Sequence, residues 1–225
     1  MNIDLVVFDM AGTTVNDEDG VNRCVRAALA EVGLVVTPEA VNEVMGIPKP
    51  LALRHLMESG GRQDLVARLD DIHADFVVRM IRFYQTDSSV REIAGASDTF
   101  RRLHSAGIKV ALDTGFSRDI AGVILERLGW TDRALVDVTV TSDEVPRGRP
   151  HGDMITKAMR DLGIADSRRV AKVGDTPSDL QEGVAAGCGL VIGVTGGSHT
   201  AAQLEPFDHT HLIGTVAELP KLLGI

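Results

Sequence analysis

The sequence predicts a three-layer α/β fold, in which helices cover both faces of a parallel sheet and an all-helical domain is inserted after the first strand. Short apolar runs recur along the chain, and each is followed by a turn residue and a stretch of helical apolar spacing. One long region interrupts this alternation and carries helical patterns alone. Strands that alternate with helices form parallel sheets that are buried on both faces.

The predicted strands are apolar runs that are too short for helices. They cover Ile3–Phe8, Val110–Leu112, Val136–Val140, Val170–Val173 and Leu190–Val194, and a terminal strand is expected around His209 and His211. The predicted helices cover Ser97–Ala106, Arg118–Leu128, Asp153–Leu162, Asp179–Ala186 and Val216–Leu223. Strands and helices thus follow each other in turn, as parallel pairing requires.

The inserted region shows no strand pattern from about Val21 to Tyr84. One helical stripe contains Val21, Val25, Ala28, Leu29 and Val32, and another runs from Leu65 to Ile81. We expect this block to stand over the carboxyl edge of the sheet as a cap, with hinges near Asp17–Gly20 and Ser88–Ala96. The predicted core is therefore formed by residues 1–16 and 90–225, and the predicted cap by residues 17–89.

Composition and charge restrict the class of protein. The chain has 225 residues, 44% of them hydrophobic, so it can bury a sizeable core. Its 23 basic and 32 acidic side chains give a formal net charge of −9, which argues against binding nucleic acid or an anionic membrane. No run reaches the roughly 18 apolar residues of a membrane span, and we expect a cytoplasmic protein. Cys24 and Cys188 show no metal or disulfide spacing, so we expect both to be buried apolar residues.

The most informative segment is Phe8-Asp9-Met10-Ala11-Gly12-Thr13-Thr14, directly after the first predicted strand. Ligands of open parallel sheets bind outside the carboxyl ends of the strands, which places Asp9 as a nucleophile or metal ligand. The backbone N–H groups of Gly12 and Thr13 can bind a phosphate there. The alternative is an aspartate that opens an ordinary turn.

Two further segments can contribute to anion binding. Thr114 and Gly115 follow the second predicted strand, where the hydroxyl can donate to an anion beside Asp9, although such pairs are also common in turns. Arg149 lies between Gly148 and Pro150 ahead of a helix. Its guanidinium can bind phosphate oxygens in a fixed fork, or it can be an exposed surface charge.

A pair of carboxylates follows the predicted strand Val170–Val173. Asp175 and Asp179 fit the oxygen coordination that Mg²⁺ prefers. As an alternative, Ser178 or Asp179 can cap the helix that follows.

In this order, and all at strand ends, these four segments resemble the haloacid dehalogenase superfamily of phosphotransfer enzymes over nearly the whole chain. The resemblance implies a Rossmann-like core with a C1-type cap, and an Asp9 that attacks phosphorus to form an aspartyl-phosphate. It implies that Thr114 and Arg149 hold the phosphoryl oxygens. It also implies a Mg²⁺ ion, which offsets the repulsion between an anionic nucleophile and an anionic substrate.

The residues that the resemblance assigns to Mg²⁺ are Asp9, the Ala11 carbonyl and Asp175, with Asp179 orienting either the metal's water or Arg149. Most phosphatases of the superfamily carry a second aspartate where this chain has Ala11. Alanine cannot protonate a leaving alkoxide, so ester hydrolysis would lose a general acid that contributes roughly 100- to 10,000-fold.

The pattern Asp-x-Ala-Gly-Thr, here Asp9 to Thr13, is similar to the phosphonatase branch, which hydrolyses the carbon–phosphorus bond of phosphonoacetaldehyde. In that branch a cap lysine condenses with the aldehyde, and the resulting imine withdraws electrons in place of the missing acid. Met45-Gly46-Ile47-Pro48-Lys49 matches the branch's Met-Gly-x-x-Lys pattern, which makes Lys49 the candidate Schiff-base residue and places Met45 and Gly46 at the substrate.

The match departs from the branch at Ala52, where a histidine is usual, and the nearest cap histidine is His55. Pro48 and Pro50 also flank Lys49, which could instead be an exposed surface charge.

Three functions therefore remain open: a phosphonatase, a phosphomonoesterase of the phosphoglycolate-phosphatase type, and a non-catalytic binding protein. The first two act on a small phosphonate or phosphorylated substrate. Members of the branch often dimerise through the cap, and Val21, Val25 and Leu29 can pack either internally or against a partner.

Overall fold

The computed structural model describes residues 2–132 and 134–225. Its larger domain is built on a six-stranded sheet with the order β5-β4-β1-β6-β7-β8, in which every neighbouring pair is parallel. The strands are β1 (Leu5–Asp9), β4 (Lys109–Thr114), β5 (Val138–Thr141), β6 (Val170–Gly174), β7 (Leu190–Val194) and β8 (His211–Ile213). The predicted fold class is confirmed.

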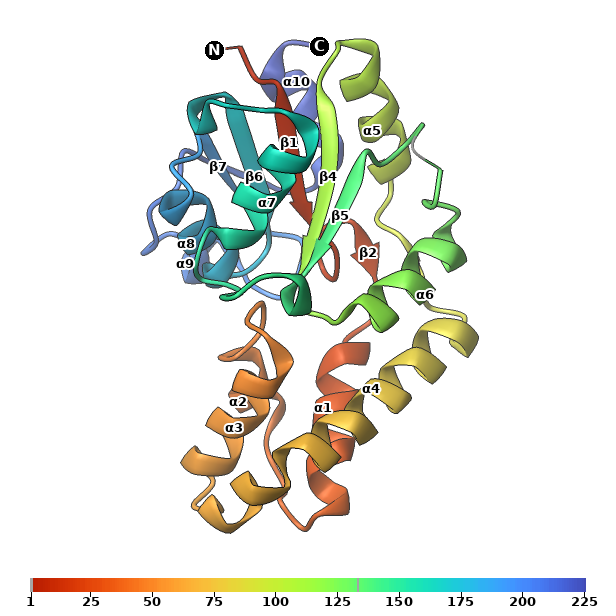
Figure 1. The fold of residues 1–225 in the computed structure, drawn as a ribbon, viewed down its shortest axis with the longest axis vertical. Helices are drawn as coiled ribbons and strands as arrows, with labels where there is room; N and C mark the ends of the chain where they lie inside the picture. Colours follow the sequence, from red (N-terminus) through yellow and green to blue (C-terminus); the bar gives the residue numbers. More distant parts are fainter. Residues whose placement is uncertain (1, 133) are drawn as a thin grey trace.

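Helices cover both faces of this sheet (Figure 1). They are α5 (Ala96–Ser105), α6 (Arg118–Leu128), α7 (Asp153–Leu162), α8 (Pro177–Ala185), α9 (Ala201–Leu204) and α10 (Leu219–Leu223), with short 3₁₀ turns at Ser142–Glu144, Ser167–Arg169 and Val216–Glu218. On one face Phe8 of β1 packs against Phe100 of α5, with ring centroids 5.2 Å apart. On the other face Val7 shares a buried cluster with Met154 of α7. All of β1 is buried, which explains its continuous apolar run.

The inserted region forms a helical domain beyond the carboxyl ends of the strands (Figure 1). Its helices are α1 (Gly20–Glu31), α2 (Pro38–Asn42), α3 (Lys49–Ser59) and α4 (Leu69–Thr86), with a 3₁₀ segment at Gln63–Arg68. Val21, Val25 and Leu29 are buried within the chain, so they pack internally and are not free for a partner. A homodimer through the cap stays a prediction.

Two short strands that the sequence analysis did not predict join the domains. Val15–Asn16 (β2) pairs antiparallel with Arg91–Glu92 (β3), where the chain leaves and re-enters the sheet domain. Nearby, the Arg127 guanidinium of α6 donates to the carbonyls of Gln85 (2.6 Å) and Asp87 (3.0 Å) beside the end of α4. The predicted domain boundaries at residues 16/17 and 89/90 fall beside this strand pair, and they stay a proposal.

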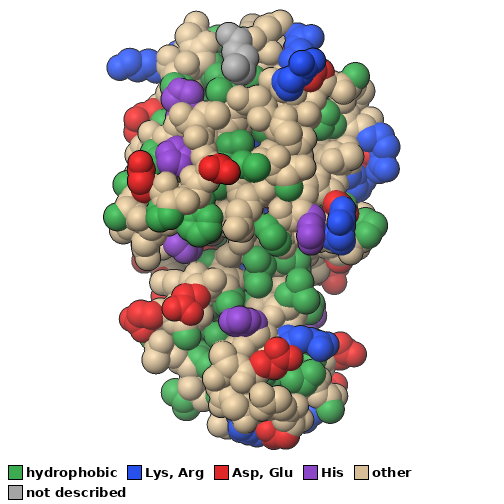
Figure 2. Space-filling view, turned by 90° about the vertical axis from the view of Figure 1, so that its left-hand side faces the viewer, with side chains coloured by type: hydrophobic (Ala, Val, Ile, Leu, Met, Phe, Trp, Pro, Cys, Tyr) green, Lys and Arg blue, Asp and Glu red, His purple; other side chains and the backbone are tan. Residues whose placement is uncertain are grey.

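Three structural features relate to the expectations drawn from composition: the distribution of surface charge, the character of the helices and the burial of the two cysteines. Acidic and basic side chains are interspersed on the face that Figure 2 shows, and the surface is indented between the two domains. In the described part of the chain, no helix has both the length and the apolar character to cross a bilayer. Cys24 and Cys188 are free thiols, and they are half-buried rather than fully buried as expected.

Candidate active site

The predicted site residues meet where the carboxyl ends of β1, β4 and β6 face the helical domain. A cavity of about 230 Å³ lies there. Its wall includes most of the predicted site residues: Asp9, Ala11, Gly12, Met45, Gly46, Lys49, Thr114, Gly115 and Arg149. Thr13, Asp175 and Asp179 are buried close by and do not line the cavity. Sequence segments that are far apart are thus brought together, with a contribution from each domain.

Three buried carboxylates cluster at the site, and of these Asp9 lines the cavity. Asp9, Asp175 and Asp179 each offer an oxygen, and these oxygens lie within 4.8 Å of one another. Asp175 is held by the Thr13 hydroxyl, which donates to Oδ1 at 2.8 Å, and by the backbone N–H and hydroxyl of Ser198, which donate to Oδ2 at 2.7 and 2.6 Å. Ser198 was not predicted, although it lies in a Gly-Gly-Ser turn after a strand, as the other site residues do.

The phosphate-binding role predicted for the first turn needs correction. The N–H of Gly12 donates to the Val15 carbonyl (2.9 Å), and the N–H of Thr13 donates to the Met10 carbonyl (3.3 Å). These donors stabilise the turn and are not directed at a ligand. Gly12 has a φ of +89°, and a Cβ there would lie 2.3 Å from Asp175 Oδ2, so this position requires glycine.

Arg149 is not a surface arginine, since its side chain is only 1% exposed. Its Nη1 donates to Asp9 Oδ1 at 2.6 Å and lies 3.1 Å from Asp179 Oδ1. Its Nε donates to Glu182 Oε2 at 2.8 Å, and its Nη2 bonds Asp113. The guanidinium therefore connects the nucleophile candidate to a buried charge network, so the surface interpretation is wrong, and the binding of phosphoryl oxygens stays a prediction.

Lys172, in the middle of β6, is the centre of that network and was missed. Its buried Nζ bonds Asp113 and lies 3.2 Å from Asp179 Oδ1 and 2.9 Å from Glu182 Oε2. Asp113, Asp179 and Glu182 also meet the geometry of a metal cluster, but the ammonium already occupies that position. A lysine inside an apolar strand is the sequence signal for such a network.

The network shifts the pKa values of two acidic side chains in opposite directions. Burial, together with the charge of Asp113, raises the pKa of Glu182 above its usual value, although Lys172 and Arg149 oppose this. Burial alone would raise the pKa of Asp113 as well, but Arg149 and Lys172 hold it below its usual value. The two cations thus favour the charged form of Asp113 over that of Glu182.

Replacing Lys172 by methionine should lower the free energy of unfolding by about 3–5 kcal/mol, because it leaves buried carboxylates without their cation. Chemical denaturation measures this change. The control is Lys157→Met, which removes a half-buried helix-surface pair to Asp161 and should cost less than about 1 kcal/mol. Equal losses in the two variants would show that the ammonium does not support the network.

Asp179 belongs to the capping box at the start of α8, but it is not the N-cap residue. Thr176 is the N-cap of α8, and its hydroxyl and N–H donate to Asp179 Oδ2 at 2.6 and 3.1 Å. The N-cap is therefore Thr176, and the expectation that Ser178 or Asp179 would cap this helix is wrong. The other oxygen of Asp179 faces Arg149 and Lys172, in agreement with a role in orienting the arginine.

The cluster of Asp9, Asp175 and Asp179 fits a divalent cation. Burial raises the pKa of Asp9 well above its usual value, Arg149 opposes this, and the charges of Asp179 and Asp175 add to it. Burial and the charge of Asp179 also raise the pKa of Asp175, while the hydrogen bonds from Ser198 lower it. Carboxylates this crowded resist ionisation, and a hard cation that prefers oxygen ligands relieves that repulsion.

Lys49 is the first residue of α3, and its side chain enters the cavity. Pro48 is the N-cap of this helix and Pro50 occupies its first turn, so the two prolines begin the helix. Lys49 is 5% exposed, and its Nζ lies 5.5 Å from the centroid of the Phe116 ring. Burial lowers the pKa of the amine to about 8, although the Asp9 charge opposes this. The surface-lysine alternative is wrong.

The loop before Lys49 contacts the sheet domain closely. The Gly46 carbonyl accepts from Arg149 Nη1 at 3.4 Å. A Cβ at Gly46 would lie 2.3 Å from Thr176 Oγ1, and one at Gly115 would lie 2.8 Å from the Ile47 carbonyl. Glycines at Gly46 and Gly115 thus allow the two domains to close over the cavity.

The hydroxyl of Thr114 lines the cavity and accepts from the Phe116 N–H at 3.2 Å, so its proton remains available for an anion. Ala52 is buried in the core of the helical domain and His55 is exposed, and neither lines the cavity. Asp17 does line it, and the sequence analysis had assigned it only to a hinge.

Known proteins are similar to this chain in sequence and in fold. The family model of the haloacid dehalogenase-like hydrolases matches residues 6–193. A phosphonoacetaldehyde hydrolase from Bacteroides fragilis is 30% identical over 238 residues, which covers 99% of this chain and 86% of the relative. A phosphonoacetaldehyde hydrolase-like protein from Oleispira antarctica has a similar structure, with a TM-score of 0.87, 20% identity, and 100% of this chain and 92% of that chain covered. So does a predicted phosphoglycolate phosphatase from Haemophilus somnus, with a TM-score of 0.83, 18% identity, and 99% of both chains covered.

Proposed function

The chain belongs to the haloacid dehalogenase-like hydrolase family, and we propose that it is a Mg²⁺-dependent phosphonatase that cleaves the carbon–phosphorus bond of phosphonoacetaldehyde. The observation that carries the proposal is the buried amine of Lys49 in the same cavity as Asp9. The relative from Bacteroides fragilis that bears this activity in its name supports it. So does Ala11, which provides no acid for an ester leaving group.

Lys49 begins the reaction. With a pKa of about 8, part of the amine is neutral near pH 7 and can attack the aldehyde carbon. Loss of water from this adduct leaves a protonated imine on Lys49. When the carbon–phosphorus bond breaks, its electron pair enters this imine and forms an enamine, so the departing carbon needs no acid from position 11.

Asp9 receives the phosphoryl group. Its carboxylate attacks phosphorus while the carbon–phosphorus bond breaks, and water then hydrolyses the aspartyl-phosphate to inorganic phosphate. Arg149, bonded to Asp9 Oδ1 at 2.6 Å, holds the nucleophile and supplies charge for the phosphoryl oxygens. Mg²⁺ bound by Asp9, the Ala11 carbonyl and Asp175 would supply further positive charge against the repulsion between carboxylate and phosphonate.

Trapping the imine tests the proposal. Phosphonoacetaldehyde and sodium borohydride should convert Lys49 into a stable secondary amine, which peptide mass spectrometry locates. Phosphate should be released when borohydride is omitted. The absence of both results would contradict the proposal. Hydrolysis of phosphoglycolate that survives Lys49→Ala would instead identify a phosphomonoesterase.

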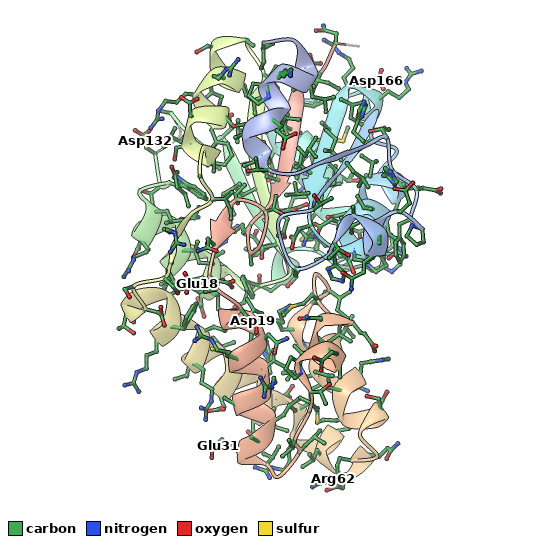
Figure 3. All side chains as sticks on the ribbon, turned by 180° about the vertical axis from the view of Figure 1, so that it is seen from behind. Glu18, Asp19, Glu31, Arg62, Asp132 and Asp166 are labelled. Carbon is green, nitrogen blue, oxygen red and sulfur yellow. The ribbon has the colours of Figure 1, made fainter. Side chains whose placement is uncertain are left out.

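Mg²⁺ should raise the melting temperature by roughly 5–10 °C at a concentration 100 times its Kd, because it binds only the folded carboxylate site. The shift should disappear in Asp175→Asn, and it should weaken as the pH falls, because protons compete at Asp9 and Asp175. Asp166→Asn is the control, since this exposed carboxylate lies at the far end of the sheet domain from the helical domain (Figure 3). A full shift in Asp175→Asn would exclude this metal site.

A further inference from the structure

Asp17 is a buried carboxyl on the cavity wall that the proposed mechanism does not use. It lies just after β2, where the chain enters the helical domain, and its residue is 9% exposed. Figure 3 shows the next residues, Glu18 and Asp19, at the junction of the two domains. Asp17 and Lys49 thus line the same cavity.

The surroundings of Asp17 keep its carboxyl close to the point of ionisation. The Tyr84 hydroxyl of α4 donates to Asp17 Oδ2 at 3.2 Å. Burial raises the pKa of Asp17 to about 6, the bonds from Tyr84 and the Val21 N–H oppose this, and the charges of Asp175 and Asp19 add to it. The group can therefore accept and return a proton near neutral pH.

Aromatic rings connect Asp17 to the reacting amine. The Tyr84 ring packs edge-on against Phe116, with centroids 6.0 Å apart, and Lys49 Nζ lies 5.5 Å from the Phe116 centroid. The charge of Asp17 is among those that raise the pKa of Lys49. Among the described residues, no carboxylate lies within 4.0 Å of Lys49 Nζ, and Lys49 and Asp17 both line the cavity that would hold the substrate.

We propose that Asp17 is the proton-transfer residue for imine formation at Lys49, a role that rests on the proposed function. The amine lone pair of Lys49 forms the carbon–nitrogen bond, and the carbonyl oxygen takes a proton from solvent water and becomes a hydroxyl. The ammonium so formed gives a proton to the Asp17 carboxylate. Asp17 returns that proton to the adduct's hydroxyl, the carbon–oxygen bond breaks with its electron pair on the departing water, and the nitrogen lone pair completes the imine.

Other groups near the amine are less suited to this role. Asp9 is bonded to Arg149 and attacks phosphorus. Ala52, at the position where the branch has a histidine, has no titratable group, and His55 is exposed. Tyr84 has a pKa raised well above its usual value by burial and by the charge of Asp17, so it retains its proton and holds the carboxylate.

The test measures the rate at which Lys49 forms its imine. The protein is mixed with phosphonoacetaldehyde under single-turnover conditions, and samples are quenched in borohydride at set times. Asp17→Asn should slow this step by at least about 100-fold. Removing the charge alone would lower the pKa of Lys49 and would make the step faster at pH 7, so the two effects have opposite signs. Asp19→Asn, a matched loss of charge two residues away, should change the rate by less than about threefold.

The pH profile gives a second measurement. In a plot of the logarithm of the wild-type rate against pH, the slope should be two below about pH 6, where Asp17 and Lys49 both lose protons. Between about pH 6 and pH 8 the slope should be one. Asp17→Asn should lack the break near 6. Tyr84→Phe removes a bond that stabilises the carboxylate, so its break should move to higher pH. This variant serves as the test if Asp17→Asn does not fold.

The outcomes separate the inference from the proposed function. Wild-type protein that forms no adduct at Lys49 contradicts both. Wild-type protein that forms the adduct, with Asp17→Asn equally fast or faster, overturns the role of Asp17 alone. The role of Asp17 is also overturned if Asp17→Asn and Asp19→Asn slow imine formation equally, or if Tyr84→Phe leaves the break near pH 6 of the rate profile unmoved.

Discussion

Asp9→Asn is expected to lower turnover of phosphonoacetaldehyde by roughly 10⁴- to 10⁶-fold, since removing the nucleophile of a covalent mechanism has effects of this size. The amide cannot attack phosphorus, and Arg149 Nη1 loses its charged partner at 2.6 Å. Imine formation at Lys49 does not require the nucleophile, so borohydride trapping should persist. Phosphate release and trapping, measured on the same sample, separate the two halves of the mechanism.

The same variant should be at least as stable as the parent without Mg²⁺ at neutral pH. The folded pKa of Asp9 is raised above its ordinary value of 3.8, so the stability that this group contributes is present at low pH and is lost as the pH rises toward the folded pKa. Asparagine at position 9 does not ionise, so the variant does not lose this stability as the pH rises. Melting temperatures in EDTA at pH 5 and pH 8 should show a smaller pH dependence for the variant, and a variant that is less stable at pH 8 would contradict this account.

The strand-end residues could be predicted because parallel strands bring their carboxyl ends to one edge of the sheet. That geometry holds for Asp9, Thr114 and Asp175 whatever the helices do. The burial of Lys49 could not be predicted in the same way, because it depends on how α3 approaches the sheet domain. Contacts at Gly46 and Gly115 set that approach, and each involves residues more than 60 positions apart in sequence.

Local rules failed where two interactions compete for one group. The N–H groups of Gly12 and Thr13 are well placed for phosphate by sequence, but carbonyls of the same turn take them. Lys172 was overlooked because a single lysine does not alter the strand pattern, and its partners Asp113 and Glu182 come from different elements. Such networks depend on side-chain placement in three dimensions, which hydrophobic periodicity does not describe.

Lys49→Arg is expected to reduce cleavage of phosphonoacetaldehyde by roughly 10³- to 10⁶-fold, because a guanidinium stays charged and cannot form an imine. The substitution keeps a long cationic side chain at the start of α3, so loss of the charge is not the cause. Wild-type activity should also rise with pH toward about 8, as the amine of Lys49 loses its proton.

Acetyl phosphate is the matched substrate control for this variant. Acetate leaves without an acid, so its release from phosphorus requires Asp9 but neither an acid at position 11 nor the amine of Lys49. Lys49→Arg should therefore retain acetyl phosphate hydrolysis within about threefold, whereas Asp9→Asn should lose it. If both substrates slow equally in Lys49→Arg, the lysine acts by holding the phosphoryl group or the closed cap. If phosphonoacetaldehyde alone slows, the amine participates in breaking the carbon–phosphorus bond, because only that bond needs an electron acceptor on carbon.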